Sequence, residues 1–316
     1  MEDAPDPARP DVSVVVVNFR SAELTVRALR DCAAAAGDLA LEEIVVEGGS
    51  GPGEADRLRA GRPGARVVEL AENRGFAAGN NAGIAVARGR HLLLLNPDAF
   101  AHGHAVARLV EELDRRPSWG LAAPLLQFED GRPQDNVHSR FPTLLTLFVD
   151  CCAPVAFLVR GTRLDPHNVT RSQLTAPREV AHAIGAVLLV RREAAAAAGP
   201  LDERFFLYLE ETEWQRRMAA AGWAIGVVPD AVFTHLAGGS SESGSPLASP
   251  HYLDSVERFY PRPRLALATM GLGALVSLAA LRPAVALRLG SARTAGLARD
   301  MAVLLRQVVR RLRAGR

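Results

Sequence analysis

The first half of the chain alternates short apolar runs with stretches of helical character. Val12–Val17 is an almost unbroken β-branched run, which is typical of a strand buried on both faces. Comparable apolar runs recur at Glu43–Glu47, Arg66–Leu70, His91–Leu95 and Trp119–Phe128. Helical stretches lie between them at Ser21–Ala36, Glu54–Ala60, Ala78–Arg88 and Gly103–Arg115. The alternation predicts a βαβ series, and hence an α/β fold with a doubly wound sheet flanked by helices.

Periodicity weakens in the middle of the chain and then returns. Pro and Asp are frequent from Glu129 to Pro177, and we expect a surface loop or lid there that includes His138, Arg140, Phe141 and Pro142. The pattern after it predicts a strand, two helices and a strand, at Ala183–Val190, Glu193–Ala198, Leu209–Gly222 and Trp223–Val228. Ser240–Pro250 is expected to be a flexible connector.

The last part of the chain has a different pattern. Leu265–Leu281 is a run of 17 uncharged residues bracketed by arginines, which is at the short end of what can span a bilayer. Beyond it, apolar residues alternate with arginines as in a basic amphipathic helix. Such a helix can lie on an anionic membrane, where each Arg near the surface adds roughly 1 kcal/mol. We therefore expect membrane association; the alternative is a helical hairpin packed against the rest of the chain or a dimer partner.

Charge supports a division at the same place. The chain carries +2 overall, but the part after Tyr260 holds 11 of the 37 basic residues and one acid, so it is net +10 and the rest is net −8. The two parts are therefore suited to different environments. Every basic residue is Arg and none is Lys, and no nucleic-acid partner is inferred from this composition.

Composition and cysteine usage indicate a globular protein of a reducing compartment. The chain is 48% hydrophobic and 23% charged. Its three cysteines, Cys32, Cys151 and Cys152, cannot form a disulfide framework, and the adjacent pair lacks the spacing of a zinc site. The first ten residues, MEDAPDPARP, have neither the basic start nor the apolar run of a signal peptide. A cytoplasmic location is expected, with the tail on the inner face of the plasma membrane.

Four short motifs lie at the ends of predicted elements. They are VVVNF at Val15–Phe19, ENRGFAAGNNAG at Glu72–Gly83, LLLLNPDA at Leu92–Ala99 and FFLYLEETEW at Phe205–Trp214. Each alone has a structural explanation, such as a capped helix or a buried strand. Their order and spacing resemble the family-2 glycosyltransferases of the GT-A fold, closest to the rhamnosyltransferase-like branch. The resemblance covers roughly Asp11–Ser241.

The resemblance implies a domain organisation. Residues 1–10 are expected to be a disordered N-terminus, 11–239 a glycosyltransferase domain with the mixed sheet of the GT-A fold, 240–261 a linker, and 262–316 a basic helical tail. The tail lies outside the resemblance, and its membrane association rests on its own pattern of arginines and apolar residues.

The NPD motif is a candidate metal site. Asp98 follows a strand of four leucines, so it emerges at the carboxyl edge of the sheet, where open α/β folds bind ligands. A carboxylate there can hold Mg²⁺ or Mn²⁺ against a diphosphate, although an Asp that caps a helix is the simpler explanation for the motif alone. The motif resembles the DxD-type element of the family. The resemblance also implies that His235, in HLAGGSS with Gly238 and Gly239, binds the metal or the diphosphate.

The acidic cluster Glu210, Glu211 and Glu213 is the candidate catalytic group. The resemblance places Glu211 on the position of the catalytic base and Glu213 on a later acid, where the family usually has aspartates. Glutamate offers the same chemistry with one more methylene of reach. Alternatively, acids at a helix N-terminus complement the helix dipole, and Glu213 has Arg217 four residues on as an ion-pair partner.

Other residues are implied to contact the two substrates. Helix N-termini bind anions and Arg74 adds a charge-assisted donor, so the second motif suits a diphosphate. The sharpest departure from the family is VVEGGSGPG, where Glu47 and Gly48 replace the usual Asp and Asn, so the nucleobase contact is expected to be shifted or weakened. Donor-binding residues are expected at Val17, Asn18, Glu47, Arg74, Gly75, Asn80, Asn96 and Asp98. Acceptor contacts are expected at His138, Arg140, Gly185 and Trp214.

The function implied is that of an inverting glycosyltransferase. Glu211 would deprotonate the acceptor hydroxyl while Asp98, His235 and a divalent cation stabilise the diphosphate. The expected donor is rhamnose linked to deoxythymidine diphosphate, with a uridine-linked sugar next; the expected acceptor is lipid-linked or a growing envelope polysaccharide. A homo-oligomer is left open. The rival hypothesis is a catalytically impaired GT-A scaffold in a polysaccharide assembly complex, motivated by Glu47, Gly48 and the all-glutamate cluster.

Overall fold

The structure is a computed structural model, and it describes residues 9–159, 162, 165, 167, 169, 171–236, 247, 249–286 and 292–314. The chain forms two compact units that exchange segments. The first contains Met1–His138, Thr170–Phe206 and Glu210–Ser240, and the second contains Ser139–Val169, Leu207–Leu209 and Ser241–Arg316. The second unit thus includes part of the segment that the sequence assigned to the glycosyltransferase domain. Apart from Arg9 and Pro10, the predicted disordered N-terminus lies outside the described residues.

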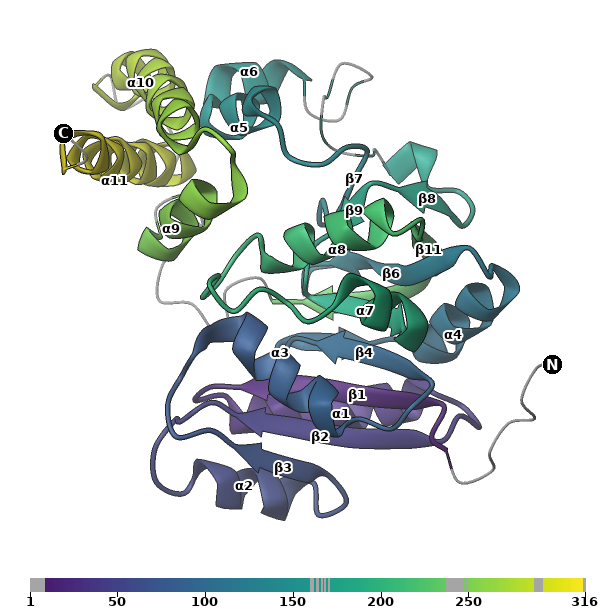
Figure 1. The fold of residues 1–316 in the computed structure, drawn as a ribbon. Helices are drawn as coiled ribbons and strands as arrows, with labels where there is room; N and C mark the ends of the chain where they lie inside the picture. Colours follow the sequence, from purple (N-terminus) through teal and green to yellow (C-terminus); the bar gives the residue numbers. More distant parts are fainter. Residues whose placement is uncertain are drawn as a thin grey trace. The chain divides into compact units, whose positions relative to one another are not determined.

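The first unit is built on one mixed sheet (Figure 1). In the described residues the strand order is β3-β2-β1-β4-β10-β6-β11-β5, with β8 paired to β11. The strands are β1 Val12–Asn18, β2 Leu41–Glu47, β3 Arg66–Glu69, β4 His91–Leu95, β5 Ala99–Ala101, β6 Trp119–Gln127, β8 Arg178–Val180, β10 Val187–Arg191 and β11 Ala224–His235. Two further short strands, β7 Val137–His138 and β9 His182–Ala183, pair antiparallel with each other.

Strand direction explains both the success and the limit of the doubly wound prediction. Strand β1 pairs in parallel with β2 and β4, and its β-branched run is buried as expected. Strand β10 then lies antiparallel between β4 and β6, which makes the sheet mixed. The short strand β5 was not predicted, because three residues carry no periodicity and its strand conformation depends on pairing with β11.

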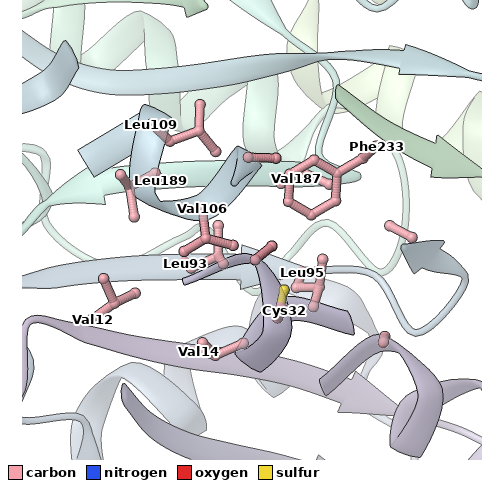
Figure 2. Packing of buried hydrophobic residues seen from close by; sticks show 14 of the residues in the cluster. Val12, Val14, Cys32, Leu93, Leu95, Val106, Leu109, Val187, Leu189 and Phe233 are labelled. Atoms are coloured by element: carbon pink, nitrogen blue, oxygen red, sulfur yellow. The ribbon is translucent and has the colours of Figure 1, made fainter. Parts of the chain in front are cut away.

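Helices cover both faces of this sheet. One face is covered by α1 (Ala22–Ala35) and α4 (Ala105–Arg115), and the other by α3 (Gly75–Val86), α7 (Arg192–Ala198) and α8 (Glu210–Ala220); α2 (Glu54–Gly61) packs on α1. Figure 2 shows the core under α1 and α4, where side chains from β1, β4, β10 and β11 meet. Cys32 is fully buried there, and burial raises the pKa of its thiol, so it remains protonated and packs as an apolar side chain.

The loop or lid predicted for 129–177 is wrong in part, because two helices lie in it. They are α5 (Leu144–Cys151) and α6 (Ala153–Val159), and the side chain of Thr143 caps the first turn of α5. Their partner is α10 (Pro263–Ala286), whose Ser277 hydroxyl donates to the Cys151 carbonyl at 2.8 Å. Since that partner is more than a hundred residues away in sequence, local periodicity could not reveal the helices.

The tail is a helical hairpin within the second unit. Helix α11 (Ala292–Ala314) buries Met301, Leu304 and Val308 against α10, while Arg306 and Arg310 are exposed. The segment expected to be a linker contains helix α9 (Pro250–Phe259), to which α11 is tied by the ion pairs of Arg311 with Asp254 and Glu257. The apolar face of α11 is therefore occupied by protein. Most of the predicted connector Ser240–Pro250 lies outside the described residues.

Helix α10 is apolar on all sides. Of the described helices, this one alone contains a stretch long and apolar enough to cross a membrane, Pro263–Leu281, with a mean hydropathy of 1.7 and 33% of it buried. Ala266, Met270 and Ala274 face protein, whereas Leu272 and Leu275 are more than half exposed. The exposed side of the helix is therefore as apolar as the buried one.

Candidate active site

Strand pairing brings Asp98 and His235 together. Asp98 directly precedes β5 and His235 ends β11, and the antiparallel ladder places Ala99 opposite His235. The Leu236 amide donates to the Asp98 carbonyl at 3.1 Å. The imidazole Nε2 consequently lies 3.4 Å from Asp98 Oδ1, with both residues buried. The rest of HLAGGSS, including Gly238 and Gly239, lies outside the described residues.

The Asp98–His235 pair fits a divalent cation. Asp98 is 1% exposed, and its Oδ1 has no hydrogen-bond donor among the described residues. An unsatisfied buried carboxylate oxygen is costly unless a cation or proton satisfies it. Carboxylate oxygen and imidazole nitrogen are together a donor set that Mn²⁺ accepts, and Mg²⁺ accepts the carboxylate. The two ligands predicted from the sequence therefore lie together in the structure.

Glu211 lies at the same edge of the sheet. Its carboxylate accepts a hydrogen bond from the Gly185 amide, and a Cβ at Gly185 would be 3.1 Å from Glu211 Cγ. The next residue, Ala186, accepts from the Asn96 amide at 2.8 Å. The connection between β9 and β10 thus joins the candidate base to the NPD motif. A Cβ at Gly185, which was expected as an acceptor contact, would lie in tight contact with the Glu211 side chain.

Burial raises the pKa of Glu211 above its ordinary value, although backbone hydrogen bonds and the Thr212 hydroxyl act in the opposite direction. A raised pKa suits a general base that must release its proton again near neutral pH.

The two residues before the helix, Tyr208 and Leu209, both have left-handed backbone, with φ of 74° and 67°. This conformation is strained for non-glycine residues, at ~1–3 kcal/mol each. The strained backbone therefore ends at Leu209, directly before the start of α8, and Glu210 separates it from the candidate base.

The other members of the acidic cluster have different environments. Glu210 is 3% exposed. Glu213 is paired with Arg217 at 2.9 Å, as the sequence alternative proposed, and Arg217 also donates to the Pro200 carbonyl at 2.8 Å. This pair joins α8 to the segment after α7. Within the cluster, Glu213 thus has a structural partner that accounts for it.

The acceptor role expected of Trp214 does not fit the structure. Its side chain is 1% exposed, and the indole N–H donates to the Gly199 carbonyl at 2.7 Å. The residue lies beside Ala195, Ala196 and Pro200, on the side of α8 that faces α7. Among the other expected acceptor contacts, His138 is buried with its ring 4.4 Å from that of His182, and Arg140 is exposed in the second unit.

The donor-binding role expected of Asn18 also does not fit its side chain. Asn18 is fully buried; its amide donates to Glu54, and its oxygen accepts from the hydroxyls of Ser21 and Thr25. Glu54, itself 5% exposed, also accepts from the Ala22 amide at 2.9 Å. No functional role was predicted for Glu54, whose carboxylate holds the turn between β1 and α1.

Three further donor candidates are used within the fold. Glu47 is 5% exposed, and its carboxylate accepts from the amides of Gly49 and Ser50, which fixes the turn after β2. Val17 packs under α3, and Asn80 is 1% exposed with its amide bonded to the Phe76 carbonyl. The side chains of Asn80 and Glu47 are thus both engaged within the fold.

The ENRGF turn supports the segment that leads to α8. Gly75 has φ of +88°, and a Cβ there would lie 2.1 Å from the Phe206 carbonyl oxygen. The Phe76 amide donates to the same carbonyl at 2.8 Å, and Arg74 pairs with Glu203 at 2.8 Å. Gly75 therefore meets a packing requirement, and Arg74 is exposed but already has an anionic partner.

Gly75→Ala is expected to destabilise the fold by ~3 kcal/mol or more, because it combines left-handed backbone with a backbone clash. Gly131→Ala is the matched control: Gly131 has φ of +78° but nothing within 4 Å of the added Cβ, so only the backbone term of ~1–2 kcal/mol remains. Urea unfolding of both variants measures the difference. Equal midpoints would contradict the packing role of Gly75.

Comparison with known proteins gives consistent matches. Residues 13–197 match the model of the glycosyl transferase family 2. An N-acetylglucosaminyl-diphospho-decaprenol L-rhamnosyltransferase of Mycobacterium tuberculosis is 28% identical over 151 residues, 46% of either chain. The succinoglycan biosynthesis protein ExoO of Rhizobium meliloti is 34% identical over 106 residues, 33% of this chain and 30% of the relative. Each match thus spans less than half of the relative's own length.

A solved structure agrees in fold. A mannosyltransferase of Pyrobaculum calidifontis, solved with GDP-Man and Mn²⁺, matches with a TM-score of 0.59 at 19% identity, over 98% of this chain and 89% of the other. At this identity the match shows the fold. The predicted mixed α/β sheet with flanking helices, of the GT-A type, is thereby confirmed.

Proposed function

The chain belongs to the glycosyl transferase family 2, and from this premise we propose that it is an inverting glycosyltransferase of cell-envelope glycan synthesis. It would move a sugar from a nucleotide-diphosphate donor to a lipid-linked or polysaccharide acceptor. The observation that carries the proposal is that a candidate cation site and a candidate general base lie at the same edge of the sheet. Asp98 and His235, which can hold a cation, and the half-buried Glu211 are joined there through Asn96 and Ala186.

The residues divide the reaction between them. Glu211, when deprotonated, accepts the proton of the acceptor hydroxyl as that oxygen forms a bond to the anomeric carbon. The bond from the anomeric carbon to the phosphate oxygen breaks on the opposite side, so the configuration inverts and the nucleoside diphosphate leaves. Asp98 and His235 would hold a divalent cation, which when bound neutralises charge on the diphosphate. The pair therefore belongs to the leaving-group side of the reaction and Glu211 to the acceptor side.

Rhamnose linked to deoxythymidine diphosphate is the proposed donor. Support comes from the four motifs and from the match to a relative whose name specifies rhamnosyl transfer. The test is a panel of sugar nucleotides linked to deoxythymidine, uridine or guanosine diphosphate, each with Mn²⁺, Mg²⁺ or EDTA. Cation-dependent release of deoxythymidine diphosphate is the expected result. Nucleotide binding without turnover of any donor, in the presence of lipid-linked acceptors, would favour the scaffold hypothesis instead.

We further propose that the second unit docks on the cytoplasmic face of the membrane. Among the described residues, the large exposed hydrophobic side chains other than Phe19 all belong to this unit. On α10 they are Leu265, Leu272, Leu275 and Val276; on α5, α6 and α11 they are Leu145, Phe157, Leu158 and Leu297. Exposed apolar surface of this extent marks a membrane or protein interface, and the net +10 tail favours an anionic membrane.

Replacing Phe157 and Leu158 together with serine is expected to weaken vesicle binding about tenfold or more. The two side chains are 88% and 71% exposed, so their loss removes membrane contact without opening the core. Phe19→Ser, in the first unit, is the matched control. Sedimentation with anionic and neutral vesicles, at low and high salt, measures binding. If the wild-type protein binds neither vesicle type, the membrane proposal is wrong, and a dimer interface would explain the exposed apolar side chains of the second unit.

A further inference from the structure

We propose that Gln134 is a positioning residue that sets the tautomer of His235 and thereby keeps the cation site open. Gln134 lies after β6, and its backbone N–H donates to the Leu126 carbonyl at 2.9 Å. Its side-chain amide makes two contacts with one residue: Nε2 donates to the His235 carbonyl, and Oε1 lies 3.0 Å from His235 Nδ1. The proposal rests on the proposed function only in assuming that a cation binds between Asp98 and His235.

The orientation of the Gln134 amide follows from its partners. The His235 carbonyl oxygen can only accept, so the amide edge facing it must be the NH₂ group. The opposite edge, Oε1, is then the atom that faces the imidazole Nδ1. A flipped amide would set two acceptors against each other at the carbonyl. The His235 carbonyl thus fixes the orientation of the Gln134 side-chain amide, and the same amide contacts the His235 imidazole.

The tautomer of His235 follows in turn. Oε1 can only accept, so Nδ1 must carry the imidazole proton. In the neutral ring Nε2 then has a free lone pair, and this lone pair faces Asp98 Oδ1 across 3.4 Å. Both facing atoms are acceptors, and Oδ1 has no donor among the described residues. A cation between them satisfies both, which is how a hydrogen-bond partner of the far ring nitrogen commonly supports a metal ligand.

The opposite tautomer would close the site. With the proton on Nε2, the ring would donate to Asp98 directly, and the carboxylate and the imidazole would satisfy each other without a cation. Removing the acceptor at Nδ1 permits that state. We therefore expect Gln134→Leu to shift His235 toward the Nε2–H tautomer.

The chain offers a matched control in Gln127. This residue ends β6, and its amide lies 3.4 Å from the hydroxyl of Thr234, next to His235. Gln127→Leu therefore makes the same chemical change beside the same strand while leaving the amide–imidazole contact of Gln134 intact. A general disturbance of β11 would affect both leucine variants; loss of tautomer control affects only Gln134→Leu.

Two measurements test the proposal. Long-range ¹H–¹⁵N correlation spectra of ¹⁵N-histidine-labelled, metal-free protein report the tautomer, with His235 assigned from His235→Asn. Titration with Mn²⁺ alone, followed by the electron paramagnetic resonance of the free ion, reports cation affinity. Gln134→Leu is expected to lose the Nδ1–H signature and ~10–100-fold in Mn²⁺ affinity. Gln127→Leu should keep the wild-type tautomer.

The outcomes separate this proposal from the proposed function. A wild-type His235 in the Nε2–H tautomer, or Gln134→Leu with wild-type tautomer and Mn²⁺ affinity, would overturn the role of Gln134 whatever donor is turned over. The expected tautomers and affinities in a protein that transfers no sugar would support the role of Gln134 and reject the proposed activity. Kinetics add a further readout, since saturating Mn²⁺ should restore kcat in Gln134→Leu.

Discussion

Glu211→Gln is expected to lower kcat by ~10²–10⁴-fold, which is the usual contribution of a positioned general base. Glutamine keeps the size of the side chain and a carbonyl oxygen that can accept from the Gly185 amide, so the connection between β9 and β10 should stay in place. Donor affinity, measured by calorimetry with the nucleoside diphosphate, should be unchanged because Glu211 serves the acceptor. The loss therefore falls on turnover and spares donor binding.

Glu213→Gln is the matched control on the same helix. Its carboxylate is engaged by Arg217, so neutralising it should lower the unfolding midpoint and change kcat far less than Glu211→Gln does. Near-normal turnover in Glu211→Gln together with inactive Glu210→Gln would move the base one residue back along the chain.

The pH profile provides an independent check on Glu211. The base works only when deprotonated, so kcat/KM should fall as pH falls through its pKa. Burial raises that pKa, so the acidic limb should lie above the pH at which an exposed glutamate titrates. In Glu211→Gln this limb should disappear from the residual activity. An acidic limb that persists in the variant would assign the titration to another group.

Asp98→Asn is expected to abolish cation-dependent transfer, because the carboxylate is the only charged ligand of the proposed pair and several kcal/mol of leaving-group stabilisation depend on the cation. Stability should be kept or raised, since the asparagine amide can donate to His235 Nε2 and removes the unsatisfied carboxylate oxygen. Asp230→Asn, an exposed carboxylate on the same strand β11, is the control. Unchanged Mn²⁺ dependence in Asp98→Asn would reject the assignment.

The parts of the fold that were predicted correctly are those with a strong local period. The strands β1, β2 and β4 and the helix α4 carry runs of buried residues that require no distant partner to be recognised. The helix predicted from Ala78 begins three residues earlier, at Gly75, because the Asn73 side chain accepts from the Gly75 amide. Helices α5 and α6 were missed because the helix they pack on comes much later in the chain.

In the site too, residues in local motifs could be predicted, whereas contacts between residues far apart in sequence could not. Motif order predicted Asp98, Glu211 and His235 as site residues, and the structure brings Asp98 and His235 together. Motif order did not separate them from Asn18 and Trp214, whose side chains turn into the fold. Gln134 could not be found at all, since it lies in a stretch without periodicity and meets a residue 101 positions away. Contacts of that kind depend on the completed sheet.

The order of strands in the sheet also sets the order in which the chain can fold as it is synthesised. Strands β1 to β4 are contiguous in sequence and can pair once His91–Leu95 has left the ribosome. Strand β6 must wait, because both of its neighbours, β10 and β11, are made later. At ~5–20 residues per second the edges of β6 stay unpaired for several seconds, and unpaired strand edges are prone to aggregation.

The ladder between β5 and β11 is the last of these pairings, and it alone brings Asp98 to His235. A nascent or truncated chain that ends before Phe233 contains all the strands except the end of β11. It therefore lacks His235, and Asp98 has no partner for a cation. If the proposed cation site binds Mn²⁺, that binding would report that translation has passed residue 235 and that the sheet has closed, and the metal would serve as a folding probe for this chain.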